Sequence, residues 1–251
     1  MKKRILIFSL LLSVFISSAQ KNEAWKEVNN TFEITSAKLR REVLPVQYKL
    51  FTFDYEKFKN QLVNVPVRGE FTGVSNVVVS FPMPNGTIED FRIIEASIFE
   101  ESLQNQFPEI RSFAGQGVND PSNTIRFSVS PYNGVSALIR SASKGTTYVI
   151  DPISMDYKTV IVFDRVHVGK SSDFICTTED AVQQFGQVLD RNADNNVVLN
   201  NADDGNLRRF RMAQSCTAEY SNYFGATSAA QVNLVISAYN RKYTRCNAVF
   251  E

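Results

Sequence analysis

The stretch TIRFSVSPYNGVSALIR, residues 124–140, alternates apolar and polar side chains on both sides of a turn. The turn signal is Asn133 followed by Gly134, a pair that favours a tight hairpin connection. Successive side chains of a strand face opposite ways, so six apolar residues share one side: Ile125, Phe127, Val129, Val135, Ala137 and Ile139. This stretch therefore predicts an antiparallel hairpin with one apolar and one wet face.

Similar runs lie on both sides of this hairpin. The further predicted strand pairs are residues 77–81 with 88–93 and residues 147–150 with 159–163. A Pro-Asn-Gly turn at 84–86 separates the first pair, and a turn at Asp151 and Pro152 separates the second. Together these runs predict an antiparallel meander.

Two short helices are expected between the strands. Asp54 is placed to cap a helix whose apolar residues share one face. Ser97 and Glu100 form a capping-box pattern for a second helix, which Pro108 ends. The fold class predicted for this part of the chain is therefore α+β, an antiparallel sheet-rich region with short helices.

The N-terminus has the build of a secretory signal peptide. Three basic residues precede an apolar run at 5–16, which is shorter than the roughly 20 residues that span a bilayer. Small side chains at Ser17 and Ala19 suit a signal peptidase that cuts before Gln20. We expect residues 1–19 to be removed between Ala19 and Gln20 and the protein to be secreted or extracellular; a retained anchor is the alternative.

Composition limits the classes of partner. Basic and acidic residues number 27 and 26, so no strong field attracts nucleic acid or an anionic membrane. We therefore expect no nucleic-acid partner, and no membrane partner once the signal peptide is removed. Aromatic residues make up 12% of the chain, which favours a packed fold over a disordered one.

The sequence divides near residue 190. Residues 190–206 are mostly Asn and Asp and are expected to be a linker, with a loop inside one domain as the alternative. A strand-like run at 207–215 and a helix starting at Thr227 follow, and an apolar run at 248–250 is expected to begin another strand. The apolar stripe of that helix comprises Val232, Val235, Ile236, Tyr239 and Tyr243.

Strand, helix and strand in that order predict the start of a βαβ unit, whose helix needs a sheet to cover it. We therefore predict a sheet-rich region at 20–189 and a truncated α/β domain at 207–251. The helix is expected to stay uncovered, and the chain to be a fragment or a truncated gene product.

Catalytic residues are not expected in this chain. His167 is the one histidine, whereas a hydrolytic zinc site needs two or three His or carboxylate ligands. No H-E-x-x-H, G-x-S-x-G, C-x-x-C or phosphate-binding glycine loop occurs. A complete enzyme of unfamiliar chemistry is therefore disfavoured.

The three cysteines are an odd number for an exported protein. Cys176 lies between the sheet-rich region and the linker, where its thiolate could reach a neighbouring domain and take the open position of a zinc ion. A disulfide to a partner beyond residue 251 and a buried thiol are the alternatives. Cys216 and Cys246 flank a predicted helix of roughly 24 Å, which argues against a bridge between them.

Several segments resemble one protein family. YKLFTFD at 48–54, VVVSFPMPNGTIEDFRI at 77–93 and FPEIRSFAGQGVNDPSNTIRFSVSP at 107–131 are similar to the pro-region of secreted, reprolysin-like zinc metallopeptidases of the metzincin class, of the Bacteroidetes type. Residues 207–251 resemble the opening strand and helix of the catalytic domain in that family.

The resemblance implies a signal peptide, a pro-region at 20–189 and then a zinc endopeptidase domain. The pro-region would assist folding and maintain latency, its partner would be its own or a cognate peptidase domain, and the complete enzyme would cut proteins or peptides. Zinc belongs to the complete protein, because the family's H-E-x-x-H-x-x-G-x-x-H helix is absent from this sequence. Cys246 replaces a residue that is often hydrophobic in the family. The alternative function is a non-enzymatic secreted sheet-rich module for binding or adhesion.

Overall fold

The computed structural model describes residues 24–28, 44–169 and 212–250. Two compact units are distinguished, one formed by residues 1–169 with 218–251 and the other by residues 170–217. The first unit contains a nine-stranded sheet and the helices. The predicted signal peptide at 1–19 and the predicted linker at 190–206 lie outside the described residues.

Neighbouring strands of the sheet are all antiparallel, in the order β1-β2-β9-β8-β7-β6-β5-β4-β3. The strands are β1 Trp25–Glu27, β2 Lys49–Phe53, β3 Val78–Pro82, β4 Ile88–Glu95, β5 Arg111–Gly117, β6 Asn123–Ser130, β7 Gly134–Ser141, β8 Thr146–Pro152 and β9 Thr159–Asp164. The helices are α2 Tyr55–Gln61, α3 Glu101–Gln106, η3 Arg165–His167, α5 Ala218–Tyr223, η4 Ala229–Gln231 and α6 Val232–Phe250.

The predicted sheet-rich α+β class is confirmed at this coarse level. All three predicted strand pairs form, as β3 with β4, β6 with β7 and β8 with β9. β1, β2 and β5 complete the sheet, and none of them belongs to a predicted pair. Among the described residues, no helix is both long enough and apolar enough to cross a membrane.

The main core lies on the concave side of the sheet. Phe58 of α2 is fully buried there, and its ring contacts those of Trp25, Phe53, Phe81 and Phe127 at centroid distances of 5.3–5.9 Å. Burying one such side chain contributes about 1.5–3 kcal/mol. By packing Phe58 against rings from several strands, α2 therefore stabilises the curled sheet on its inner side.

Trp25 also links the two edges of the sheet. Its indole N–H on β1 donates to the Ser80 carbonyl of β3 at 2.8 Å. β1 and β3 are the first and last strands of the sheet order, and no described backbone ladder joins them. The sheet thus curls until its edges meet through a side chain.

The two predicted helix starts differ in outcome. Asp54 caps α2 as expected, because its carboxylate accepts from the Lys57 N–H at 3.0 Å. The capping box of α3 was wrong, since Glu100 occupies the N-cap without a side-chain cap bond. Ser97 instead accepts from the Phe99 N–H at 3.1 Å in the loop before the helix, and its hydroxyl donates to Gln104 Oε1 of α3 at 2.7 Å.

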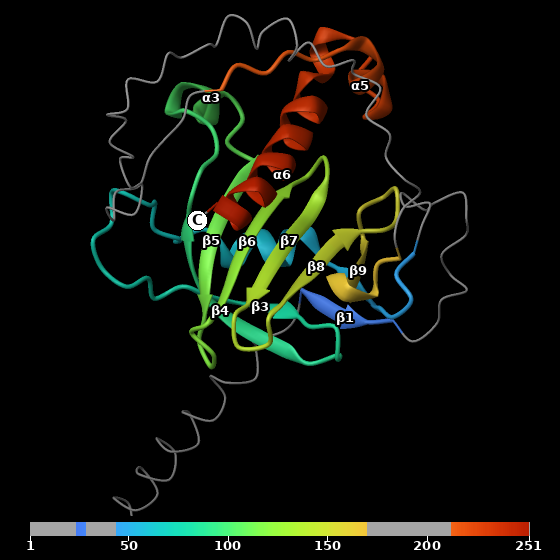
Figure 1. Cartoon of the computed structure of the whole chain (residues 1–251). Coiled ribbons are helices and arrows are strands. Elements are labelled where there is room, and N and C mark those ends of the chain that lie inside the picture. Colours follow the sequence, from blue (N-terminus) through green and yellow to red (C-terminus); the bar gives the residue numbers. More distant parts are fainter. Residues whose placement is uncertain (1–23, 29–43, 170–211, 251) are drawn as a thin grey trace, which may run out of the picture. The chain divides into compact units, whose positions relative to one another are not determined.

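α6 packs across the outer face of the sheet, over β5, β6 and β7, and α2 lies on the opposite side (Figure 1). The prediction that the C-terminal helix stays uncovered was therefore wrong. The physical reason is that the prediction rested on burial of apolar residues alone, whereas the contact between α6 and the sheet is mainly polar.

The predicted boundaries at the C-terminus also need correction. The long helix begins at Val232 rather than Thr227 and continues through residues 248–250, which were predicted as a strand. Helical spacing explains this, because Thr244 and Ala248 lie one turn apart and both are buried. Residues 212–215, the part of the strand-like run that the structure describes, have no regular structure.

Candidate functional site

The outer face of the sheet carries a polar surface, which we call the docking face. It comprises Ser130, Asn133, Ser136, Arg140, Asp151 and the backbone carbonyl of Arg111, all in contact with α6. Strand alternation creates this surface: Phe127 and Val129 point into the core, so Ser128 and Ser130 point outward.

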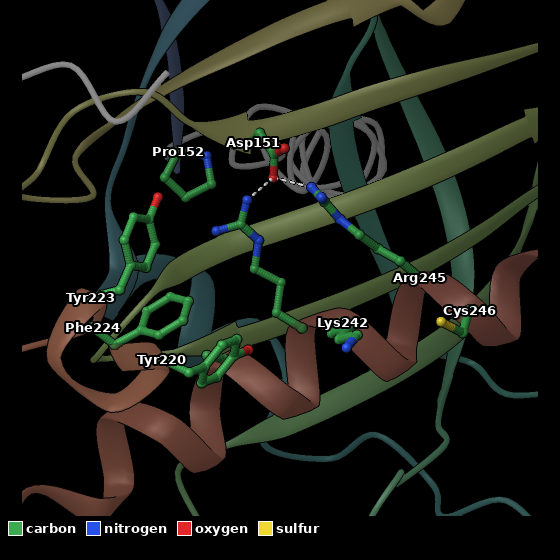
Figure 2. A pocket seen from close by; sticks show the side chains of 10 residues that line it. Asp151, Pro152, Tyr220, Tyr223, Phe224, Lys242, Arg245 and Cys246 are labelled. Carbon is green, nitrogen blue, oxygen red and sulfur yellow. Dashed lines mark hydrogen bonds and ion pairs between the residues drawn. The ribbon is translucent and has the colours of Figure 1, made fainter. Parts of the chain in front are cut away.

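Asp151 on β8 is the centre of the docking face. Its Oδ1 accepts from Arg241 Nη2 at 2.8 Å, from Ser136 Oγ at 2.9 Å and from Arg245 Nη2. Arg245 also donates from Nε to Ser136 Oγ at 3.1 Å. Figure 2 shows the Asp151 carboxylate facing the Arg245 guanidinium. Two arginines one turn apart on α6 thus converge on one carboxylate oxygen of the sheet.

The environment keeps Asp151 ionised. Its side chain is only 10% exposed, and burial by itself would raise the carboxyl pKa. The charges of Arg241 and Arg245, with hydrogen bonds from Arg245 and Ser136, outweigh burial and lower the pKa to about 2. The charge-assisted bonds therefore persist throughout the neutral and mildly acidic range.

A second group of contacts holds the N-terminal part of α6. The hydroxyls of Ser130 and Ser237 lie 2.5 Å apart, and both residues are buried. With its amide oxygen turned toward the helix, Asn133 accepts from Ser237 Oγ at 2.8 Å and from the Ala238 N–H at 3.1 Å. This part of the interface therefore consists of hydroxyl and amide groups.

Two contacts with backbone carbonyls extend the interface along α6. Asn240 Nδ2 donates to the Arg111 carbonyl at 3.0 Å. Arg140 Nη1 donates to the Ala248 carbonyl at 3.1 Å, near the C-terminus of α6, where a cation also complements the helix dipole. Contacts thus run over three turns, from Ser237 to Ala248.

α6 presents two different faces. The face toward the sheet is polar or small at helical spacing and comprises Ser237, Asn240, Arg241, Thr244, Arg245 and Ala248. The predicted apolar stripe packs elsewhere: Val235 and Tyr239 form a separate cluster with Ala226 and Tyr220, and the rings of Tyr220 and Tyr239 stack at 5.3 Å. Residues 218–250, which we call the helical hairpin, therefore bury part of that stripe within the hairpin itself, whereas Val232 stays exposed.

An open cavity of about 530 Å³ adjoins Asp151. Tyr220, Tyr223 and Phe224 form one side of it, and Lys242 and Arg245 of α6 form another (Figure 2). Arg241 and Cys246 also line it. The cavity marks the place where the hairpin, the end of β8 and solvent meet.

The structure does not bring together the described residues that were singled out from the sequence. Ala19, Gln20 and Cys176 lie outside the described residues. Cys216 and Cys246 are free thiols. His167 ends the short turn η3, and its backbone carbonyl accepts from the Val46 N–H at 2.9 Å. Within residues 24–28, 44–169 and 212–250, no group of three or more His, Cys, Asp or Glu side chains could hold a metal ion.

The docking face was not predicted from the sequence, because Asp151 was assigned to a turn. The available signal was the pair Arg241 and Arg245 at i, i+4, on the same helical face as small polar residues. Such a face can meet a buried carboxylate, but its partner lies 90 positions away in the sequence.

Comparisons with known proteins give little. No protein-family model matches the chain, and no curated protein matches it. A solved structure titled "Structure of a chaperone-substrate complex" aligns at 13% identity over 53% of this chain and 97% of that chain, with a TM-score of 0.33. A similarity of that size carries no argument about fold or function.

Proposed function

We propose that residues 20–189 are the pro-region of a secreted zinc metalloendopeptidase and that residues 207–251 open its catalytic domain. The pro-region assists folding and maintains latency, and its partner is its own or a cognate peptidase domain. Protein or peptide substrates belong to the complete enzyme. Residues 1–251 by themselves are not catalytically complete.

One observation carries this proposal: the sheet binds the helix of the segment that resembles the start of the catalytic domain. The two arginines of α6 end on Asp151, which is almost fully buried. Breaking a buried ion pair by removing one partner costs about 3–5 kcal/mol, so the contact is suited to holding a client segment. The described residues do not form a zinc site, and no catalytic step is assigned to them.

Export is part of the proposal. The basic start, short apolar run and small residues of the N-terminus support cleavage between Ala19 and Gln20. The intact mass of the exported protein tests it, and the expected N-terminal residue is Gln20. A secreted product that still begins at Met1 would contradict a cleaved signal peptide.

The latency proposal is tested by adding residues 20–189 to the mature peptidase. We expect inhibition, and we expect Asp151→Asn to weaken it, because the docking face then lacks the carboxylate that pairs with Arg241 and Arg245. Glu70→Gln is the matched control, since it removes an exposed carboxylate. Circular dichroism checks that each variant is folded. No inhibition by the folded wild-type segment would favour the alternative, a secreted binding module.

Cys176→Ser separates two routes to latency. A thiolate on the zinc would displace the water that the metal activates, so its loss should raise the inhibition constant more than tenfold. An inhibition constant within a few-fold of the wild-type value would place latency in the covering sheet surface alone. Metal spectroscopy of the complex reports sulfur ligation directly.

A further inference from the structure

The interface between α6 and the sheet has the composition of a reversible contact. The sheet contributes hydroxyls, an amide and a carboxylate, and the helix contributes Ser237, Asn240, Arg241 and Arg245. Water can solvate all of these groups when the surfaces part. Val235 and Tyr239 pack with Tyr220 and Ala226 inside the hairpin, so these apolar contacts do not depend on docking to the sheet.

Asp151 makes the docking face selective. A nearly buried carboxylate without a counter-charge is strongly unfavourable, so the face penalises any helix that lacks cations at this position. Selection by such a penalty acts even where the remaining contacts are permissive.

The geometry also distinguishes arginine from lysine. Arg245 donates to Asp151 through Nη2 and to Ser136 through both Nε and Nη2. A planar guanidinium can make these contacts together, whereas an ammonium group is a single point of charge.

We infer that the docking face is a selective receptor for a helix that carries two arginines one turn apart among small polar residues, and that it binds the helical hairpin of this chain without a covalent connection. This deepens the proposed function by naming the contact through which the pro-region would hold its client. The occupant is residues 218–250, and its recognition residues are Arg241 and Arg245.

The test uses the full chain with a specific protease site placed within residues 190–206. After cleavage, size-exclusion chromatography at micromolar concentration shows whether the two pieces stay together. We expect them to co-elute, and dissociation on dilution to give the affinity. Separation of the wild-type pieces at this concentration would overturn the inference.

Variants test the selectivity. We expect Asp151→Asn to weaken association roughly 100-fold, and Arg245→Lys to weaken it roughly tenfold. Glu70→Gln and Arg165→Gln are controls, since both residues are exposed, and they should leave the affinity within twofold. Hydrogen exchange of β6 and β7 confirms that each sheet remains folded. An affinity for Asp151→Asn within twofold of wild type would refute selection by the carboxylate.

Measuring both association of the pieces and inhibition of the peptidase distinguishes the docking face from the latency function. Loss of association together with retained inhibition of the peptidase would refute the docking face and leave the pro-region function to another surface. Retained association without inhibition would support the receptor and refute latency.

Discussion

Asp151 connects the chemistry of single residues to the stability of the chain. Its pKa is lowered from 3.8 to about 2 in the folded state, because the arginines and Ser136 outweigh the effect of burial. A lowered carboxyl pKa contributes stability above the unfolded value, and this contribution is lost as the pH falls through the folded value. The contribution is about 2 kcal/mol at neutral pH.

This linkage gives a prediction for acid. The difference in unfolding free energy between wild type and Asp151→Asn should be largest above about pH 5 and should shrink between pH 4 and pH 2. The groups facing Asp151 are Arg241, Arg245 and Ser136, with Lys242 lining the same cavity. Urea unfolding at pH 6 and pH 2.5 measures the difference. A difference that is equal at both values would contradict the linkage.

For single residues, the sequence predicts which face of the sheet a side chain lies on but not which distant residue it contacts. The alternation in residues 124–140 correctly places Ile125 and Phe127 in the core. The same alternation puts Ser136 on the other face, yet nothing local indicates that Arg245 will reach it from a distant helix. Long-range polar contacts depend on the folded surface, which short-range patterns do not encode.

Among the elements, α6 differs most from expectation and supplies a direct test. An uncovered helix would exchange its amide hydrogens rapidly, whereas a docked helix protects them. We expect strong protection between Val235 and Thr244, which are buried, and fraying near the exposed Phe250. Hydrogen exchange resolved to short peptides measures this. Rapid exchange throughout α6 would show that the helix does not dock in solution.

Asp151→Asn serves as the comparison in the same experiment. It should raise exchange in α6 while leaving β6 and β7 unchanged, because those strands are held by their own ladders and by the core on the other face. Equal acceleration in both regions would mean that helix and sheet unfold together.

The strands show where pattern recognition succeeds and why it fails. β3, β4 and β6 to β9 have strong alternation or β-branched runs and are predicted. β5 was missed because its sequence, RSFAGQG, contains two glycines and little apolar character. Gly115 is small for a structural reason: a Cβ there would lie 2.9 Å from side-chain atoms of Ile93 and Ile125. Close packing against both neighbouring strands thus requires a glycine at position 115, and this glycine interrupts the apolar alternation that would otherwise predict the strand.

For the whole molecule, the sheet-dominated class follows from the sequence, and the covering of its outer face does not. The apolar stripe of the C-terminal helix suggests a missing sheet, since an apolar helix face normally needs one. The folded chain instead buries Val235 and Tyr239 of that stripe within the hairpin and turns the polar face toward the sheet. The amphipathic pattern was correct, and the assumption about which face meets the sheet was wrong.

The order of the elements along the chain also determines the order in which they appear during synthesis. β1 to β9 are complete at Asp164, and α6 begins at Val232, roughly 70 residues later. At roughly 5–20 residues per second, that interval lasts roughly 3–14 s, whereas antiparallel sheets of this kind fold within milliseconds to seconds. The receptor surface can therefore be finished while the helix that it receives is still being made. Synthesis from the N-terminus would then let the folded sheet bind α6 as soon as the helix has been made.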